Sequence, residues 1–119
     1  MVEHYITLGG QRYRAEVNWN TFERFAALKR IPISEVLKFR LDEGDNLKVM
    51  LTASIIEGER IEGRTFDKDP MKVGEMMNAA SVGDFYDLFM AQYATPEDGD
   101  AQDPEAEPAK KKRFLRKKS

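Results

Sequence analysis

The hydrophobic rhythm of the chain changes at one point near its start. Between Ile6 and Val17, apolar residues alternate with polar ones around Gly9-Gly10, whereas from Trp19 onward they recur every three or four residues. Alternation is typical of strands that bury one face, and a glycine pair is typical of a tight hairpin turn. A spacing of three and four is typical of an amphipathic helix. The sequence therefore predicts one small β-hairpin that leads directly into helices.

The predicted hairpin has one apolar face. Ile6 and Leu8 share one side of the first strand, and Tyr13, Ala15 and Val17 share one side of the second. Because an isolated two-stranded hairpin is only marginally stable in water, this face must pack against the helices that follow.

The first two predicted helices are short. Asn18 or Asn20 caps the first helix, and Pro32 stops it because the residue before a proline avoids the helical region. Ser34 is predicted to cap the second helix. The apolar residues assigned to these helices are Phe22, Phe25, Ala26, Val36, Leu37 and Leu41, with Trp19 left open.

Further helices are predicted in the second half of the chain. The third is capped by Asp45 and ends at Gly58 as its C-cap. The fourth starts at Asp69-Pro70, in the usual order of N-cap and first helical residue. A break near Gly83, with Ser81 as the new N-cap, would separate it from a fifth helix.

The predicted fold class is α+β, mostly α: an N-terminal two-stranded hairpin, four or five short packed helices and a disordered C-terminal tail. Residues 1–94 form the helical domain and residues 95–119 the tail. Residues 95–108 carry six acids and no base, and residues 109–119 carry seven bases and no acid. The domain therefore keeps 12 of the 19 bases and 15 of the 21 acids. Such charge separation with few apolar residues is typical of disordered segments.

The residues that most enzymes and metal sites need are scarce. The chain has no cysteine and a single histidine, His4. Most of the ligands of a zinc site and the residues of a cysteine–histidine nucleophile system are therefore missing. Three carboxylate pairs could in principle do acid–base work: Glu57 with Glu59, Asp67 with Asp69, and Asp84 with Asp87. Nothing in the sequence suggests that any of them is buried. We therefore expect no enzyme activity, catalytic residue, cofactor or metal.

The segment Gly58–Thr65, GERIEGRT, matches the phosphate-binding pattern GxxxxGK[ST] except that arginine replaces lysine. Glu59 and Glu62 would place negative charge where a phosphate sits, and the segment follows a predicted helix instead of a strand. We expect no nucleotide binding here.

The chain has no stretch approaching the ~20 apolar residues of a membrane span and no signal-peptide pattern at its start. These features, together with the lack of cysteine, favour a cytoplasmic protein without membrane contact.

Methionine and aromatic residues concentrate in the last predicted helices. A domain of this size is not expected to bury them all, and methionine-rich surfaces can adapt to varied partners. The predicted partner-binding residues are Met76, Met77, Phe85, Tyr86, Phe89, Met90 and Tyr93.

The sequence resembles the tail assembly chaperones of long-tailed bacteriophages and prophages. Three stretches carry the resemblance: YITLGGQRYRAEVNWNTFERF, RIPISEVLKF and LKVMLTASIIEGERIEG. They are similar to the family's hairpin and aromatic helix, its turn into the second helix, and its amphipathic helix with the polar loop that follows. Arg30-Ile31-Pro32 stands where the family usually has glycine.

The resemblance implies a non-enzymatic role in the host cytoplasm. Such proteins bind the tape measure protein while tail tube subunits assemble around it, and they are absent from the mature virion. It also implies the tail tube protein as a further candidate partner. Many members of the family are made in two lengths by a ribosomal frameshift, for which Lys110–Lys112 is the candidate position. Self-association is left open.

Two other functions remain open from the residues alone. One is a structural tail or neck completion protein that stays in the virion. The other is a nucleic-acid-binding module acting through Lys110–Lys118, with Phe114 stacking on a base. The acidic run before this segment would compete for its lysines, so nucleic acid is not the expected partner.

Overall fold

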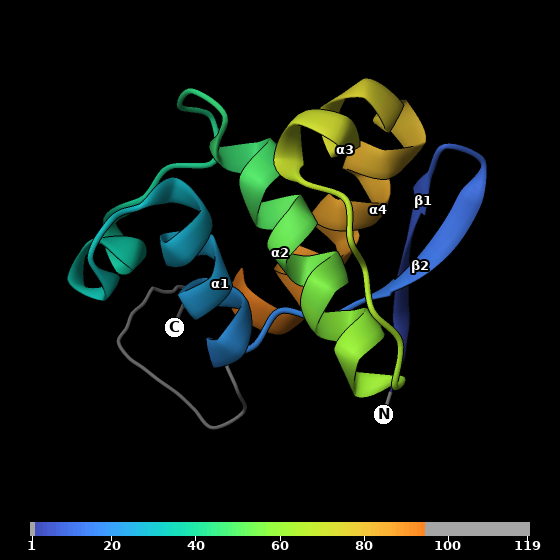
Figure 1. Ribbon diagram of the computed structural model, residues 1–119, viewed down its shortest axis with the longest axis horizontal. Coiled ribbons are helices and arrows are strands. Elements are labelled where there is room, and N and C mark those ends of the chain that lie inside the picture. Colours follow the sequence, from blue (N-terminus) through green and yellow to red (C-terminus); the bar gives the residue numbers. More distant parts are fainter. Residues whose placement is uncertain (1, 95–119) are drawn as a thin grey trace, which may run out of the picture.

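An N-terminal β-hairpin is followed by helices, which confirms the predicted α+β, mostly helical class (Figure 1). The computed structural model describes residues 2–94. The strands are β1 (His4–Leu8) and β2 (Gln11–Ala15); the helices are α1 (Trp19–Lys29), the 3₁₀ helix η1 (Ile33–Lys38), α2 (Asn46–Ile61), α3 (Pro70–Met76), α4 (Ala79–Phe89) and the π-helical turn η2 (Met90–Ala94). The predicted tail, residues 95–119, lies outside the described residues.

The hairpin has the predicted turn, but β2 ends at Ala15, so Val17 lies beyond the strand in which it was predicted. Ile6 pairs with Tyr13 and Leu8 pairs with Gln11 in the antiparallel ladder. Gly9 and Gly10 have φ values of 59° and 82°, which a two-residue turn with two positive φ angles requires. The register places Ile6 and Tyr13 on the same face, which packs against the core.

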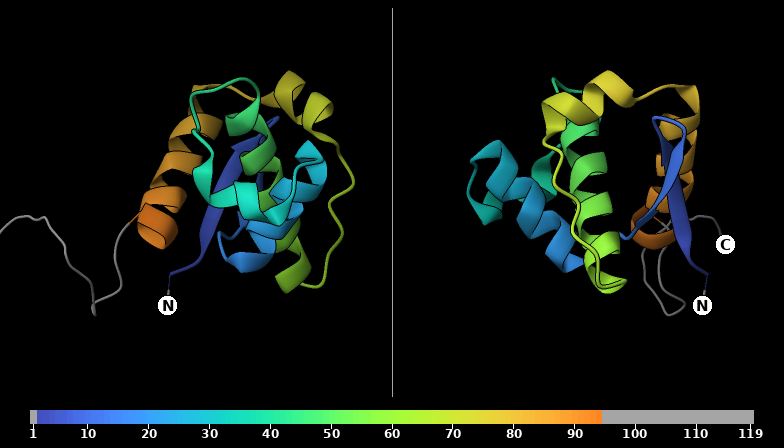
Figure 2. Two further views of the ribbon diagram at one scale, coloured as in Figure 1. Left: turned by 90° about the vertical axis from the view of Figure 1, so that its left-hand side faces the viewer. Right: turned by 45° about the vertical axis from the view of Figure 1, so that its right-hand side comes forward.

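Helix α2 is the centre of the molecule. It lies between α1 on one side and the hairpin with α4 on the other (Figures 1 and 2). All seven residues from 49 to 55 are buried, so this part of the helix is covered on every side and not on one face alone. The hydroxyls of Thr52 and Ser54 donate to backbone carbonyls one turn earlier, at 2.8 and 2.9 Å, which makes their burial possible.

The outer edges of both strands are tied to helices. On β2 and just after it, the backbone N–H of Arg14 donates to Glu59 and that of Glu16 donates to the Ser54 carbonyl, at 2.8 and 3.0 Å. On β1, the Thr7 N–H donates to Asp84 at 2.8 Å. The Ser81 hydroxyl in turn donates to the Thr7 carbonyl at 2.5 Å. These bonds pair backbone groups that would otherwise be unpaired along the outer edges of the strands. They also hold the hairpin against α2 and α4.

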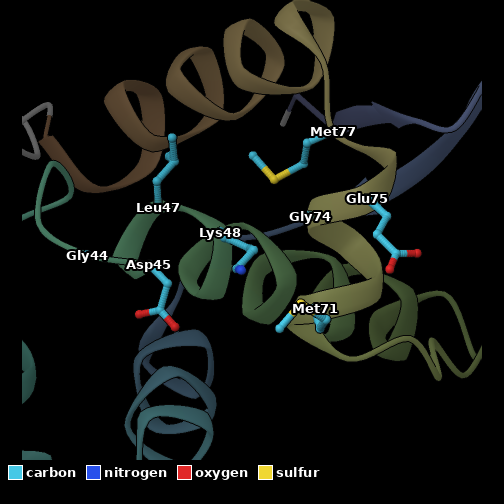
Figure 3. A pocket seen from close by; sticks show the side chains of 8 residues that line it. All are labelled: Gly44, Asp45, Leu47, Lys48, Met71, Gly74, Glu75 and Met77. Atoms are coloured by element: carbon cyan, nitrogen blue, oxygen red, sulfur yellow. The ribbon is translucent and has the colours of Figure 1, made fainter.

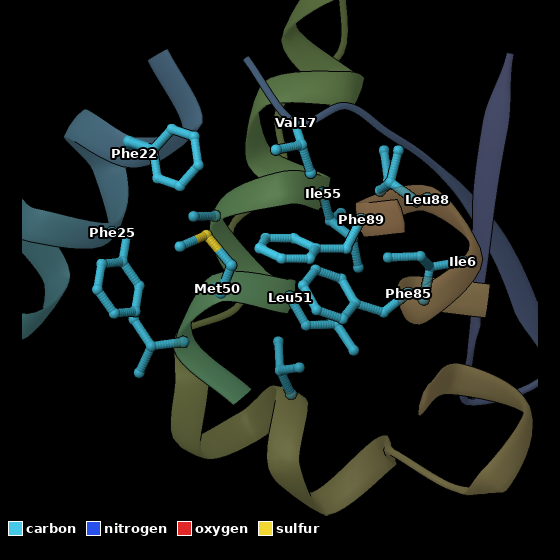
Figure 4. Packing of buried hydrophobic residues seen from close by; sticks show 14 of the residues in the cluster. Ile6, Val17, Phe22, Phe25, Met50, Leu51, Ile55, Phe85, Leu88 and Phe89 are labelled. Carbon is cyan, nitrogen blue, oxygen red and sulfur yellow. The ribbon is translucent and has the colours of Figure 1, made fainter. Parts of the chain in front are cut away.

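The core is formed where α4 faces α2. Phe85 and Phe89 project from α4 toward Met50 and Leu51 of α2, and Ile6 of β1 closes the same space (Figure 4). The two phenylalanine rings lie 5.5 Å apart. All five side chains are buried.

The predicted C-cap at Gly58 is wrong. Helix α2 continues to Ile61, and Glu62 occupies the C-cap position. Gly58 lies instead where β2 passes close to the helix: a Cβ atom there would be 2.3 Å from the Arg14 carbonyl oxygen and 2.4 Å from the Ala15 nitrogen. Tertiary contact between strand and helix, not helix termination, therefore requires this glycine.

The predicted break near Gly83 is also wrong, because the chain breaks earlier. Helix α3 ends at Met76, and Asn78 caps α4. The Asn78 side chain accepts from the Ser81 N–H at 3.1 Å, while the Ser81 hydroxyl accepts from the Asn78 N–H at 3.2 Å. Ser81 is thus the second member of a capping box, which satisfies two free N–H groups at once, and α4 runs through Gly83.

The caps of the earlier helices differ in kind. Asn18, and not Asn20, caps α1 through a capping box with Thr21. Ser34 does not act as a cap, since Pro32 precedes η1 and no side chain bonds to its first turn. Asp45 occupies the N-cap position of α2 but makes no capping bond; its carboxylate pairs with Lys29.

Candidate partner-binding surface

An exposed apolar stripe runs along the end of α4 into η2. Tyr86, Met90 and Tyr93 follow one another at spacings of four and three residues, which places them on one helix face. Their exposed fractions are 41%, 55% and 42%. Trp19, the first residue of α1, is 51% exposed. We call these four residues the aromatic surface.

Buried rings connect the two parts of this surface. Phe22 of α1 lies 6.1 Å from Trp19 and 5.1 Å from Tyr93, measured between ring centroids. Tyr93 also lies 4.8 Å from the ring of Phe89. Since Phe22 and Phe89 belong to the core, the exposed rings rest on a packed support that limits their motion.

The residues predicted to bind a partner fall into three groups. Phe85 and Phe89 are buried and form part of the core. Met76 and Met77 are half-buried and pack against the core. Tyr86, Met90 and Tyr93 are exposed. The structure therefore brings the last three together on one exposed face, apart from the core and from the two half-buried methionines.

Trp19 was not among the predicted partner-binding residues. Its place on α1 depends on which asparagine caps the helix, and the sequence allowed both Asn18 and Asn20. With Asn18 as the cap, Trp19 is the first helical residue, and about half of it is exposed to solvent.

Acidic residues flank the aromatic surface. From Ala79 to Ala94, α4 and η2 contain Asp84 and Asp87 and no basic residue. Asp84 is engaged by the Thr7 N–H, whereas Asp87 is exposed beside Tyr86. On α1, the exposed Glu23 lies one turn after Trp19. The surface is thus apolar at its centre and negatively charged along its sides.

A shallow groove of about 500 Å³ lies elsewhere, between the start of α2 and α3 (Figure 3). Leu47, Met71 and Met77 supply its apolar lining. Its two carboxylates are engaged, Asp45 with Lys29 and Glu75 with Lys72. The apolar and charged side chains of the groove do not converge on one position within it.

The expectation that Glu57 is not buried is wrong. Its carboxylate is fully buried and accepts hydrogen bonds from the Asn18 and Asn20 amides and from Arg60, at 2.7 to 3.1 Å; Arg24 lies 3.4 Å away. The Arg60 guanidinium, followed by the two asparagine amides, lowers the pKa of Glu57 from 4.5 to about 2 against the effect of burial. Glu57 is therefore an ionised structural residue that links α1 to α2.

Glu59 is buried in the same way, on the opposite side of Gly58. It accepts the Arg14 backbone N–H and a two-pronged contact from Arg64, whose guanidinium lowers the pKa of Glu59. The Arg14 side chain is itself only 5% exposed and pairs with Glu16 and Glu62. These contacts fasten β2 to the end of α2.

Acid should weaken the fold through Glu57. Because its pKa is lower in the folded state, its contribution is present above pH 4.5 and is lost as pH falls from about 4.5 to about 2. We expect roughly 2–3 kcal/mol of the free energy of unfolding to be lost over this range. Urea denaturation between pH 7 and pH 2.5 measures it, with Glu57→Gln as the control. An equally steep pH dependence in Glu57→Gln would show that other groups cause the loss.

The segment that matches the phosphate-binding pattern forms the last turn of α2 and the loop after it. Glu59 within it already holds Arg64, so the basic residue of the pattern is neutralised. Among residues 2–94, no cluster of three or more metal-ligating side chains occurs. Nor does this part of the chain contain a helix with the length and apolar character of a membrane span.

Comparisons with protein-family models, with curated proteins and with solved structures find no match to this chain.

Proposed function

We propose that the protein is a non-catalytic tail assembly chaperone of a long-tailed bacteriophage, which binds the tape measure protein through the aromatic surface. The observation that carries the proposal is the solvent exposure of Trp19, Tyr86, Met90 and Tyr93 above a buried aromatic support. Exposed apolar clusters of this kind mark interaction sites in soluble proteins. The resemblance described above supplies the identity of the partner.

The chemistry of the surface suits an apolar segment of another protein. Tryptophan and tyrosine bury large areas while few rotatable bonds are immobilised, and they dominate binding energy in many interfaces. Methionine adapts its shape to different neighbours. Such a surface can hold successive apolar segments of a long, aggregation-prone protein without demanding one sequence.

The buried carboxylates support a binding role over a catalytic one. Glu57 and Glu59 are each saturated by arginine and amide donors, and their pKa values are lowered. A general acid at neutral pH would need the opposite shift. In this proposal the protein acts in the host cytoplasm and does not remain in the virion, which mass spectrometry of purified virions would test.

Substitution of the aromatic surface should weaken tape measure binding. We expect Trp19→Ser with Tyr93→Ser to raise the Kd for a tape measure fragment roughly tenfold or more, because truncating central aromatic residues typically costs over 1–2 kcal/mol. Titration calorimetry measures the change, and circular dichroism verifies that the variant is folded.

Met71→Ser provides the matched control. Met71 is also apolar and exposed, but it lines the groove between α2 and α3. Unchanged binding in the Trp19/Tyr93 variant together with weakened binding in Met71→Ser would move the partner site to the groove. If neither the unmodified chain nor any variant binds the fragment, the tape measure assignment itself fails.

A further inference from the structure

The aromatic surface combines two properties that together select a type of ligand. Its centre offers the exposed rings of Trp19 and Tyr93, and its sides carry the carboxylates of Glu23 and Asp87. The described residues of α4 and η2 contain no base that would neutralise Asp87, and Arg24, which follows Glu23 on α1, is paired with Glu57. A short segment with apolar residues between cations would match both properties.

The C-terminal part of the chain contains such a segment. Lys110–Lys118 reads KKKRFLRKK, in which Phe114-Leu115 is enclosed by seven basic residues and no acid. Its two apolar residues could contact the exposed rings while its cations lie near the flanking carboxylates. Arginine on either side of the apolar pair is also suited to stacking on tryptophan and tyrosine rings.

The connection between the segment and the surface is long enough for them to meet and short enough to keep them close together. Tyr93 belongs to the surface, and the 20 residues from Ala94 to Arg113 separate it from Phe114. A coil of that length spans roughly 22–27 Å on average. Such a tether typically gives an effective concentration of about millimolar, so weak contacts are enough for appreciable docking.

The acidic residues of the tether compete for the lysines of the segment, but they do not compete for the aromatic surface. The first 94 residues have three more acids than bases, so residues 97–107, with six acids and no base, are repelled by the domain. The basic segment is attracted to it. Opposite charge signs in successive parts of the tail would therefore favour the approach of Phe114-Leu115, and not of the tether, to the aromatic surface.

We propose that Lys110–Lys118 docks on the aromatic surface of its own chain through Phe114 and Leu115, and that it competes there with any external partner. Docking of the segment does not depend on which external protein the surface binds.

The absence of cysteine and the single tryptophan allow a direct test in the full chain. A nitroxide attached to Ser119→Cys should selectively broaden the NMR signals of the Trp19 indole N–H and of the Tyr86 and Tyr93 amides. Replacing Phe114 and Leu115 by serine in the labelled chain should restore those signals. Broadening that is absent, or that survives the double substitution, overturns the proposal.

Two further experiments test whether docking depends on charge and whether it occurs within one chain. Glu23→Lys with Asp87→Lys should reduce the broadening, whereas Asp67→Lys with Glu75→Lys, an equal charge change at exposed sites elsewhere, should not. Added salt should reduce it as well, because the screening length falls from about 10 Å at 0.1 M to about 3 Å at 1 M. If labelled, isotope-free chains broaden the signals of unlabelled, isotope-enriched chains equally well, the occupant is a second copy and the intramolecular proposal is wrong.

Discussion

Replacing Gly58 by alanine is expected to lower the free energy of unfolding by about 3 kcal/mol or more. The added Cβ would lie 2.3 to 2.4 Å from three backbone atoms of Arg14 and Ala15. Backbone atoms of a paired strand cannot move aside as a flexible side chain can, so β2 must shift away from α2. That shift would also strain the bonds from β2 to Glu59 and Ser54.

The sign of this effect separates tertiary packing from helix propensity. Glycine to alanine in a helix interior normally stabilises by up to about 1 kcal/mol. Gly83 of α4 provides the matched control, since a Cβ there would meet nothing within 4 Å. Urea denaturation should therefore show a higher midpoint for Gly83→Ala and a much lower one for Gly58→Ala. A Gly58→Ala protein as stable as the unmodified chain would mean that β2 does not approach α2 this closely.

Phe85→Ala is expected to destabilise the fold by about 3–5 kcal/mol, the usual range for emptying a buried phenylalanine site. Phe85 is fully buried and faces α2 and β1 (Figure 4). Its neighbour Tyr86 lies on the exposed side of the same helix, so Tyr86→Ala should change the stability by less than about 1 kcal/mol.

This neighbouring pair also decides how binding data on α4 are to be interpreted. Loss of partner binding in Phe85→Ala would accompany loss of the fold, whereas loss in Tyr86→Ala would report the surface. Thermal denaturation of both variants alongside binding measurements makes the distinction. Similar large losses of stability in both variants would show that α4 is rotated from the orientation described.

The sequence could not resolve which side of α4 faces solvent and which side faces the core. Phe85, Tyr86, Phe89, Met90 and Tyr93 are all apolar or aromatic and are spread around the helix, so Asp84 and Asp87 do not mark off a single apolar side. The packing of α4 against α2 and β1 makes that choice, and it divides the predicted partner-binding residues between core and surface.

Local signals in the sequence were sufficient for most of the secondary structure. Alternation between Ile6 and Val17, with Gly9-Gly10, specified the hairpin because strand periodicity and turn geometry depend only on near neighbours. The start of α3 at Asp69-Pro70 was predictable for the same reason: Asp69 accepts from the Lys72 N–H, as an N-cap should.

Only the tertiary structure decided the roles of residues 57–59. The sequence marked Gly58 as a helix end and gave no sign that its two neighbouring carboxylates are buried. Each carboxylate pairs with a nearby arginine, Arg60 or Arg64. Its other partners lie far away along the chain: Asn18 is 39 residues from Glu57, and Arg14 is 45 residues from Glu59. Burial of a charge is tolerable only where such partners converge, and a close approach of backbones requires glycine only where the strand crosses the helix. Both conditions arise from how the hairpin packs against α2, which local periodicity does not encode.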